Sequence, residues 1–263
     1  MDSIQIQSIT TIEQLKEMQV VEEAVWQMPP TPIHQTYTAV NHGGIALGAY
    51  DGDNMIGFLY SFAGFNGKET YLCSHMLGIL PEYRKTGLGT KMKFQQAELA
   101  KELGYSYITW TFDPLESLNA YLNIHKLGAV GAYYKENHYG EMNDGLNTGL
   151  PTDRIQIIWD MNKNVGEKKK ITVDPSKVVL DNISNKPLLK EDLETFLTND
   201  GSVFVAIPNN IQQLKREQIE IAKQWRFNIR KVLQRLFEEG YLAANVATVP
   251  SKGSFYYFTK NQN

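Results

Sequence analysis

The 263-residue sequence predicts an α/β fold of the α+β kind, in which helices flank a mixed, mainly antiparallel sheet. Strand-like apolar runs alternate with segments whose apolar residues recur at helical spacing. Two short turn sequences, DGD and FNGKE, separate three of these runs, which favours tight reversals between antiparallel strands. Polarity and charge then rise over residues 162–177, which indicates a linker before a smaller C-terminal α/β half-domain.

The first part of the chain is expected to contain a strand, one or two helices, a three-stranded meander, a further helix and another strand. SIQIQSI alternates like a strand, and residues 10–26 have helical spacing behind Thr10 and Thr11 as candidate caps. The runs GGIALGAY, NMIGFLYSFAG and TYLCSHMLGIL supply the meander. The next helix ends at Gly104, before the strand YSYITWTF, and its apolar stripe consists of Leu88, Met92, Leu99 and Leu103.

Residues 113–129, DPLESLNAYLNIHKLGA, are predicted as a helix with Asp113 as its N-cap and Pro114 in its first turn. AYYKENHYG and DRIQIIWDM are predicted to be the last two strands of a domain that spans residues 1–161. After the linker at 162–177, residues 178–263 are expected to form the half-domain, with the strand GSVFVAIP, one long helix and a hairpin made of YLAANVATV and SFYYFTK.

The half-domain repeats an order found in the first domain. A strand ends at Leu80-Pro81, a helix follows and Gly104-Tyr105 starts the next strand; Ile207-Pro208, a helix and Gly240-Tyr241 come in the same order. We interpret this as a degenerate half-repeat, and two unrelated strand-helix-strand units are the alternative.

Composition excludes several classes of partner. Lys and Arg number 26 against 29 Asp and Glu, a net charge of −3, which gives no electrostatic reason to expect nucleic acid or an anionic membrane. No apolar stretch approaches the roughly 20 residues that span a bilayer. The single cysteine, Cys73, and the absence of a signal-peptide pattern predict a soluble, cytoplasmic protein. The five histidines show no metal-ligand spacing, so no metal is expected.

The stretch LPEYRKTGLG places two cations and two glycines where a strand is followed by a helix. A helix N-terminus exposes unpaired N–H groups and the positive end of the helix dipole, and glycines let a ligand approach those groups closely. Arg84 and Lys85 just before Gly87 and Gly89 therefore indicate an anion-binding loop. A solvated surface turn is the alternative.

With these elements in this order, residues 3 to about 161 resemble the GNAT (Gcn5-related N-acetyltransferase) family. RKTGLG, residues 84–89, fits the family's Arg/Gln-x-x-Gly-x-Gly/Ala motif, and LGILPEYR resembles the strand that pairs with the pantetheine arm of acetyl-CoA. SLNAYLNIHKLGA resembles the helix that ends the family pattern. The resemblance implies a GNAT-type sheet, with acetyl-CoA as cosubstrate. Because no glycine lies between Pro208 and Gly240, the half-domain is expected to lack a phosphate loop.

The resemblance and the chemistry of a pyrophosphate together define a set of candidate CoA-binding residues. Consecutive N–H groups at the helix start bind the phosphates, the cations add charge and the preceding strand pairs with the pantetheine arm. One of two asparagines on the later helix, where Ser117 stands at the family's usual Asn position, contacts the arm or the thiol. These residues are Leu77, Gly78, Ile79, Arg84, Lys85, Thr86, Gly87, Leu88, Gly89, Thr90, Asn119 and Asn123.

Ile124 stands where many family members carry a tyrosine that protonates the departing CoA thiolate, and isoleucine cannot do this. Candidate catalytic residues are therefore His75 as general base, and Tyr121, Tyr133 and Tyr134 as substitute acids. A core histidine and packing aromatics are the alternative readings. His125, near a helix end, is interpreted as a capping or surface residue.

The sequence thus predicts an N-acetyltransferase of the EC 2.3.1 class that moves acetyl from acetyl-CoA to a small-molecule or peptide amine by direct attack. The sequence leaves open whether the chain forms a homodimer. One alternative is a non-catalytic acyl-CoA-binding protein, because of Ile124. The other is a structural or interaction module. The acceptor amine does not follow from these motifs, because acceptor pockets are built from variable loops.

Overall fold

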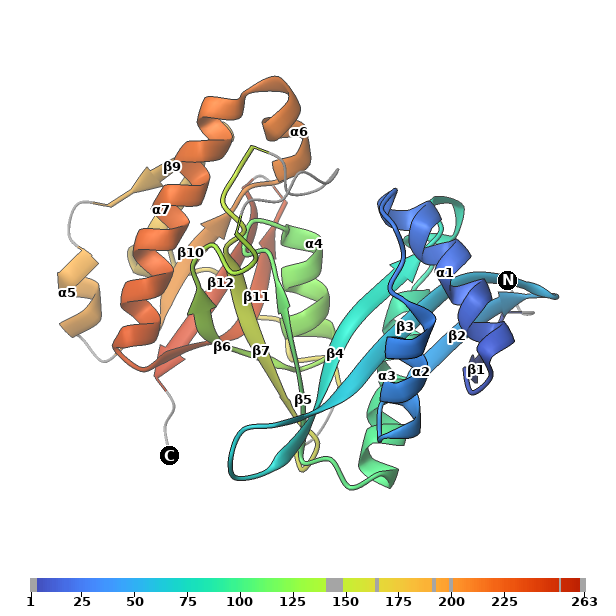
Figure 1. Ribbon diagram of the computed structural model, residues 1–263. Helices are drawn as coiled ribbons and strands as arrows, with labels where there is room; N and C mark the ends of the chain where they lie inside the picture. Colours follow the sequence, from blue (N-terminus) through green and yellow to red (C-terminus); the bar gives the residue numbers. More distant parts are fainter. Residues whose placement is uncertain are drawn as a thin grey trace. The chain divides into compact units, whose positions relative to one another are not determined.

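The computed structural model describes residues 4–140, 149–163, 166–190, 193–198, 201–250 and 252–260. Its contacts form two compact units (Figure 1). Unit 1 comprises Met1–Trp110 and Trp159–Asn164, and unit 2 comprises Thr111–Ile158 and Val165–Asn263. Each unit has helices on a mainly antiparallel sheet, so the predicted mixed α/β class is confirmed. The domain boundaries 1–161, 162–177 and 178–263 stay a prediction.

Unit 1 contains the elements that the sequence predicts, in the predicted order. Its strands are hydrogen-bonded in the order β1 (Gln5–Ser8), β2 (Ala46–Asp51), β3 (Asn54–Phe65), β4 (Thr70–Ile79) and β5 (Tyr107–Phe112), which runs on into unit 2. The pairs from β1 to β4 are antiparallel, and β5 is parallel to β4. The connecting helices are α1 (Ile12–Trp26), α2 (Ile33–Asn41), the short 3-10 turn η1 (Pro81–Tyr83) and α3 (Leu88–Glu102).

Helices α1 and α3 cover opposite faces of this sheet. Helix α1 starts at a capping box, in which Thr11 accepts from the Gln14 N–H and the Gln14 side chain accepts from the Thr11 N–H. The apolar face of α1 packs on Phe58 and Tyr60, whereas the start of α3 faces Leu77 on the other side of the sheet.

The buried stripe of α3 differs from the prediction. Leu103 caps the helix and is 58% exposed, while Lys93 and Gln96 are buried. The helix therefore presents two polar side chains to the sheet where the sequence pattern predicted only apolar ones.

Strand β4 has a bulge in its middle. Tyr60 of β3 pairs with Met76 and the next residue, Ser61, pairs with Ser74, so His75 is an extra residue on β4. A bulge of this kind redirects side chains and interrupts regular pairing. Ser74 faces α3, whereas the His75 ring packs beside Tyr60 on the α1 face.

Strand β4 also separates from β5 near this bulge. The two strands pair at Leu72↔Ile108 and Cys73↔Thr109. Within the described residues of unit 1, β4 has no partner strand on that side from Ser74 to Ile79. Its backbone groups there are available to another extended chain.

In the described part of unit 2, seven strands are hydrogen-bonded side by side, and β8 and β10 form the one parallel pair. The strand order is β7 (Arg154–Asp160, which runs on into unit 1), β6 (Val130–Lys135), β11 (Tyr241–Val249), β12 (Gly253–Lys260), β10 (Val203–Ile207), β8 (Val178–Ile183) and β9 (Lys186–Leu189). Its helical segments are α4 (Ser117–Ala120), the π-helix η2 (Tyr121–Lys126), the 3-10 turn η3 (Pro175–Lys177), α5 (Leu193–Thr198), α6 (Ile211–Glu217) and α7 (Ile219–Glu238).

Helix α7 lies along the sheet of unit 2 (Figure 1) and supplies much of its core. The predicted stripe of this helix is fully buried: Trp225, Ile229, Val232 and Leu236. The predicted long helix is divided at Gln218 into α6 and α7. No helix among the described residues is long and apolar enough to cross a membrane.

The helix predicted from Asp113 begins four residues later. The Asp113 carboxylate accepts the Leu115 N–H, which closes a local turn, and α4 starts at Ser117. The following turn is a π-helix, a form that often occurs at functional sites.

Candidate active site

The predicted anion-binding loop connects β4 to α3 within unit 1. Hydroxyl groups help to hold it: the Tyr83 hydroxyl donates to Asp51 (2.9 Å), and the Thr86 hydroxyl donates to the Tyr83 carbonyl (2.8 Å). Lys85 has a left-handed φ of 63°, and Gly87, the N-cap of α3, has a φ of 84°. Left-handed residues in such a turn direct successive N–H groups into one concavity that attracts anions.

Six consecutive N–H groups of this loop have no backbone acceptor among the described residues. Those of Leu88, Gly89 and Thr90 form the first turn of α3 and have no acceptor within the helix. Over residues 4–140, which the structure describes without a gap, the N–H groups from Lys85 to Gly87 donate to no backbone carbonyl. Arg84 is exposed, and its Nε donates to the Ile79 carbonyl (2.9 Å), which holds the guanidinium beside the loop.

The glycines of this region serve different purposes. Gly87 is required by its backbone conformation. At Gly78 a Cβ would lie 2.7 Å from the Phe58 ring, so this glycine serves core packing. At Gly89 a Cβ would make ordinary contacts of 3.4 Å and 3.5 Å with Ile79 and Leu77, and φ is not left-handed. Neither the backbone nor the packing of unit 1 therefore requires glycine at position 89.

His75, the predicted general base, lies at the bulge of β4 and is exposed. Its ring meets those of Tyr60 and Phe62 edge-on, with centroids 6.4 Å and 5.7 Å away. Partial burial lowers the pKa of His75, and the Glu22 carboxylate raises it. The net shift is downward, which favours a neutral imidazole that accepts a proton at neutral pH.

Glu22 on α1 is a candidate that the sequence analysis missed. Its side chain is buried, and its Oε1 accepts both the backbone N–H (3.0 Å) and the hydroxyl (2.8 Å) of Thr31. Its Oε2 has no hydrogen-bond partner among the described residues. An unpartnered buried carboxylate oxygen is costly, and a ligand cation would satisfy it.

Lys93 on α3 is a second missed candidate, on the opposite face of the sheet. Its side chain is 4% exposed, and its Nζ donates to Ser74 Oγ (2.7 Å) and more weakly to Gln96 Oε1 (3.4 Å). The Nζ atom also lies 3.8 Å from the centre of the Trp110 ring. Burial lowers the pKa of Lys93 to about 7, and Cys73 opposes this slightly.

The residues predicted from the later helix belong to unit 2. Asn119 is exposed on α4, whereas Asn123 is buried in the π-helix, where its carbonyl accepts the Ala129 N–H. The Tyr121 ring stacks on His125 with centroids 4.7 Å apart.

The interpretation of His125 as a capping or surface residue is wrong. Its side chain is 1% exposed, and Nδ1 lies 2.9 Å from Asn245 Oδ1 of β11. A strand more than a hundred residues further along the chain covers this helix, and local sequence does not show such a contact.

The two tyrosines of β6 have different surroundings. Tyr133 is 56% exposed. The Tyr134 hydroxyl donates to Asp153 at 2.6 Å, and burial together with the Asp153 charge raises the pKa of Tyr134 well above its usual value. Tyr134 therefore holds its proton more tightly than an ordinary tyrosine.

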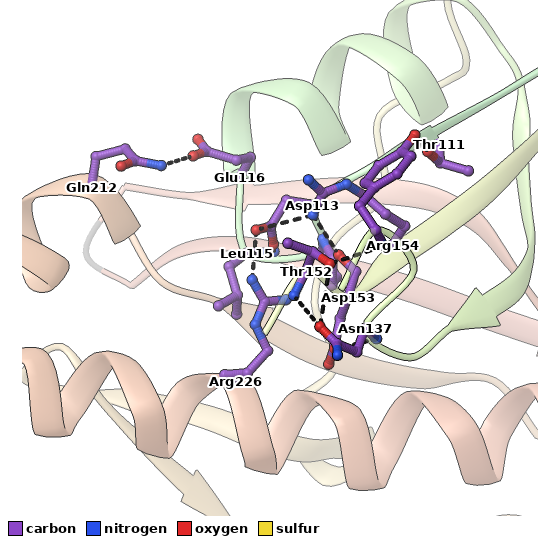
Figure 2. A network of polar contacts seen from close by, with 12 residues as sticks. Thr111, Asp113, Leu115, Glu116, Asn137, Thr152, Asp153, Arg154, Gln212 and Arg226 are labelled. Atoms are coloured by element: carbon purple, nitrogen blue, oxygen red, sulfur yellow. Dashed lines mark hydrogen bonds and ion pairs between the residues drawn. The ribbon is translucent and has the colours of Figure 1, made fainter. Parts of the chain in front are cut away.

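Asp153 and Asp113 belong to a buried ionic network in unit 2. Figure 2 shows Arg226 projecting from α7 toward Asp113, and the Arg226 Nη2 donates to the Asp113 carboxylate. Asp153 accepts two hydrogen bonds from Arg230, both 2.8 Å long. These paired charges attach α7 to the chain segments around it, a structural role. The described residues include no group of three or more His, Cys, Asp or Glu side chains that could hold a metal ion.

Comparison with known proteins gives one family match. Residues 12–128, which include β4, the loop and α3, match the Acetyltransferase (GNAT) family. Among curated proteins none matches the chain.

Several solved structures are similar at low identity. The ribosomal-protein-S18-alanine N-acetyltransferase from Escherichia coli has a TM-score of 0.48 and 16% identity, over 64% of this chain and 99% of that one. Arabidopsis thaliana Naa50, in complex with the bisubstrate analogue CoA-Ac-MVNAL, has a TM-score of 0.47 and 14% identity, over 59% and 97%. Arabidopsis thaliana NAA60, in complex with a bisubstrate analogue, has a TM-score of 0.46 and 12% identity, over 60% and 98%. The family match covers the motif-bearing part of the sequence, and residues 12–128 of the chain belong to the GNAT superfamily.

Proposed function

We propose that this protein is an N-acetyltransferase that moves the acetyl group of acetyl-CoA to a primary amine. The observation that carries the proposal is the loop between β4 and α3, whose six N–H groups, from Lys85 to Thr90, are available at a helix N-terminus. A pyrophosphate is a dense anion that suits such a site. Gly89 supports this assignment because the fold itself does not require glycine there.

The open edge of β4 supports a site for the pantetheine arm. From Ser74 to Ile79 this edge lacks a partner strand within the described part of unit 1. The arm contains two amide groups, which form with Leu77, Gly78 and Ile79 the kind of main-chain hydrogen bonds that an added strand forms. Ser117 stands at the family's usual Asn position, and Asn119 or Asn123 of the same segment remains the proposed further contact.

The transfer requires a neutral amine, a proton acceptor and a donor to stabilise the developing oxyanion. The amine attacks the thioester carbonyl, a backbone N–H at the open edge of β4 stabilises the oxyanion, and His75 or a water takes the proton from nitrogen. Tyr121, Tyr133 and Tyr134 remain the sequence-based proposals for protonating the thiolate. Of these three, Tyr134 is the least suitable donor, because of its bond to Asp153.

The experiment combines binding with turnover on the full chain. Calorimetry measures acetyl-CoA binding, and a thiol-release assay with a panel of amines (spermidine, free lysine and peptides with free N-termini) measures transfer, with mass spectrometry of the products. The proposal predicts binding together with amine-dependent thiol release. Binding without release from any amine would favour a non-catalytic acyl-CoA-binding protein, and absence of binding would favour an interaction module.

A further inference from the structure

The Lys93 side chain ends where β4 and β5 stop pairing. Cys73↔Thr109 is the last pair, so the next residues on the two strands are Ser74 and Trp110. The Lys93 Nζ contacts both, at 2.7 Å from Ser74 Oγ and 3.8 Å from the centre of the Trp110 ring. The amine therefore lies at the point where the two strands separate, on the face that α3 covers.

No carboxylate pairs with Lys93 among the described residues, since its polar partners are a hydroxyl, the Gln96 amide oxygen and an aromatic ring. Cys73 is the titratable group that acts electrostatically on it, and burial raises the pKa of this thiol, so it carries no charge at neutral pH. A buried ammonium without an opposite charge is unfavourable. An anion delivered to this point would supply that charge.

The length of the CoA arm brings such an anion within reach. The pantetheine arm has about as many chain bonds as four or five residues of extended peptide, which span at most about 3.3–3.6 Å each. If the pyrophosphate binds the loop and the arm follows the open edge of β4, the sulfur lies beside the residue four or five positions before Ile79 in the sequence. That position falls at His75 and Ser74, beside the Lys93 amine.

We propose that Lys93 stabilises the departing CoA thiolate and gives it a proton, with Ser74 holding the amine in place. This inference rests on the proposed acetyltransferase function. As the amine attacks, the new N–C bond forms, the C–S bond breaks and sulfur keeps the electron pair. Sulfur then takes a proton from the Lys93 ammonium, which becomes a neutral amine, while His75 or water accepts the proton that the attacking nitrogen loses.

The chemistry of this position suits a proton donor. Because burial brings the pKa of Lys93 to about 7, the ammonium is present at neutral pH and gives up its proton readily. The buried Ile124, at the position of the usual family tyrosine, cannot donate one. Lys93 of α3 would therefore donate the proton to the thiolate, a role that Ile124 cannot fill.

Binding of CoA and of desulfo-CoA, which lacks the sulfur, tests this role without an acceptor amine. Calorimetry at about pH 7, where the Lys93 ammonium is populated, compares the affinities of the full chain for the two molecules. Wild type should prefer CoA, and Lys93→Met should reduce that preference severalfold, because an opposite charge lowers a thiol pKa by roughly one to three units. Affinity for desulfo-CoA should not change. Lys101→Met, an exposed lysine of the same helix, should keep the wild-type preference.

The variant is expected to fold, since Ser74 Oγ and Gln96 Oε1 stay hydrogen-bonded to each other (3.1 Å) when the amine is removed. Ser74→Ala provides a second variant, which keeps the ammonium but removes the hydroxyl that accepts its hydrogen bond. This variant should reduce the preference for CoA less than Lys93→Met does. If Lys93→Met binds CoA and desulfo-CoA in the wild-type ratio, the inference is overturned. If wild type binds neither molecule, the proposed function fails as well, so the two failures are distinguishable.

Discussion

The bulge at His75 gives two neighbouring side chains of β4 different surroundings. Ser74 contacts the Lys93 amine on the α3 face, while the His75 ring packs beside Tyr60 on the α1 face, within electrostatic reach of Glu22. Acyl transfer to an amine needs a proton acceptor for nitrogen and a proton donor for sulfur. In the proposed mechanism, one irregularity in strand pairing separates these two groups across the sheet.

At the residue scale, the coupling between Glu22 and His75 is directly measurable. The Glu22 carboxylate raises the pKa of His75, so Glu22→Gln should lower that pKa, while the new amide still accepts from Thr31. NMR titration of the imidazole signals measures it, with His75→Gln to assign the resonance. Glu23→Gln, which removes an exposed charge from the next position of α1, is the control and should leave the pKa nearly unchanged. An unaltered His75 pKa in Glu22→Gln would show that the carboxylate does not act on this ring.

Lys93 should also make stability depend on pH. Its pKa is about 7 in the folded chain and 10.5 in an exposed lysine, so between these values the unfolded chain binds more protons. Wild-type stability should then rise with pH, by up to about 1.4 kcal/mol per unit. Lys93→Met removes this dependence. The free energy of unfolding of the variant should therefore exceed that of wild type most at about pH 7, and the difference should shrink toward about pH 9.5. Urea denaturation over that range provides the measurement, and a constant difference between the two proteins would contradict a neutral buried amine.

Neither Glu22 nor Lys93 could be identified from sequence. Both stand in amphipathic helices, where a charged residue ordinarily faces solvent. Their burial depends on partners far along the chain, as with Lys93, whose contacts come from β4 and β5. The phosphate loop could be predicted because its glycines, its cations and the helix after it are contiguous in sequence. Its geometry follows from local backbone chemistry.

At the element scale, β6 offers a comparison between two adjacent tyrosines. The Tyr134 hydroxyl donates to the buried Asp153 carboxylate, while Tyr133 is 56% exposed. Tyr134→Phe should lower the free energy of unfolding by about 1.5–3 kcal/mol, as expected for a hydrogen bond to a charged group, and Tyr133→Phe should not change it. Chemical denaturation measures both, and the thiol-release assay shows whether either hydroxyl takes part in transfer. Equal stability of the two variants would mean that the bond to Asp153 contributes nothing.

The elements of unit 1 follow closely from their sequence patterns, whereas parts of unit 2 do not. Strands β8 and β9 and helix α5 were not predicted, because they are short and lie in or beside a polar stretch. The sequence predicts Asp113 as a helix N-cap, yet its carboxylate closes a turn with Leu115 and pairs with Arg226 from α7. A tertiary ion pair thus overrides the local signal, and the helix begins later.

At the scale of the whole molecule, the chain passes between the units more than once. Unit 2 combines residues 111–158 with 165–263. A fragment of residues 1–165 would therefore leave β6 without its partner β11, and Asp113 and Asp153 without the arginines of α7. Unpaired buried charges and an open strand edge both disfavour a soluble fold. We expect the fragment to be aggregated or inactive.

Size-exclusion chromatography with light scattering, followed by acetyl-CoA calorimetry, checks the fragment against the full chain. A soluble, monomeric fragment with full activity would show that the C-terminal part is an independent appendage.

The central claim is that the loop between β4 and α3 binds the pyrophosphate of acetyl-CoA, and calorimetry of acetyl-CoA with Gly89→Asp tests it most directly. A Cβ fits at position 89, so circular dichroism should show a native fold. The added carboxylate lies where the phosphates bind, and binding should weaken about 100-fold or more, since like charges in contact cost several kcal/mol. Thr70→Asp, which adds the same charge at the exposed far end of β4, should bind as wild type does. A folded Gly89→Asp variant with wild-type affinity would contradict the assignment of this loop.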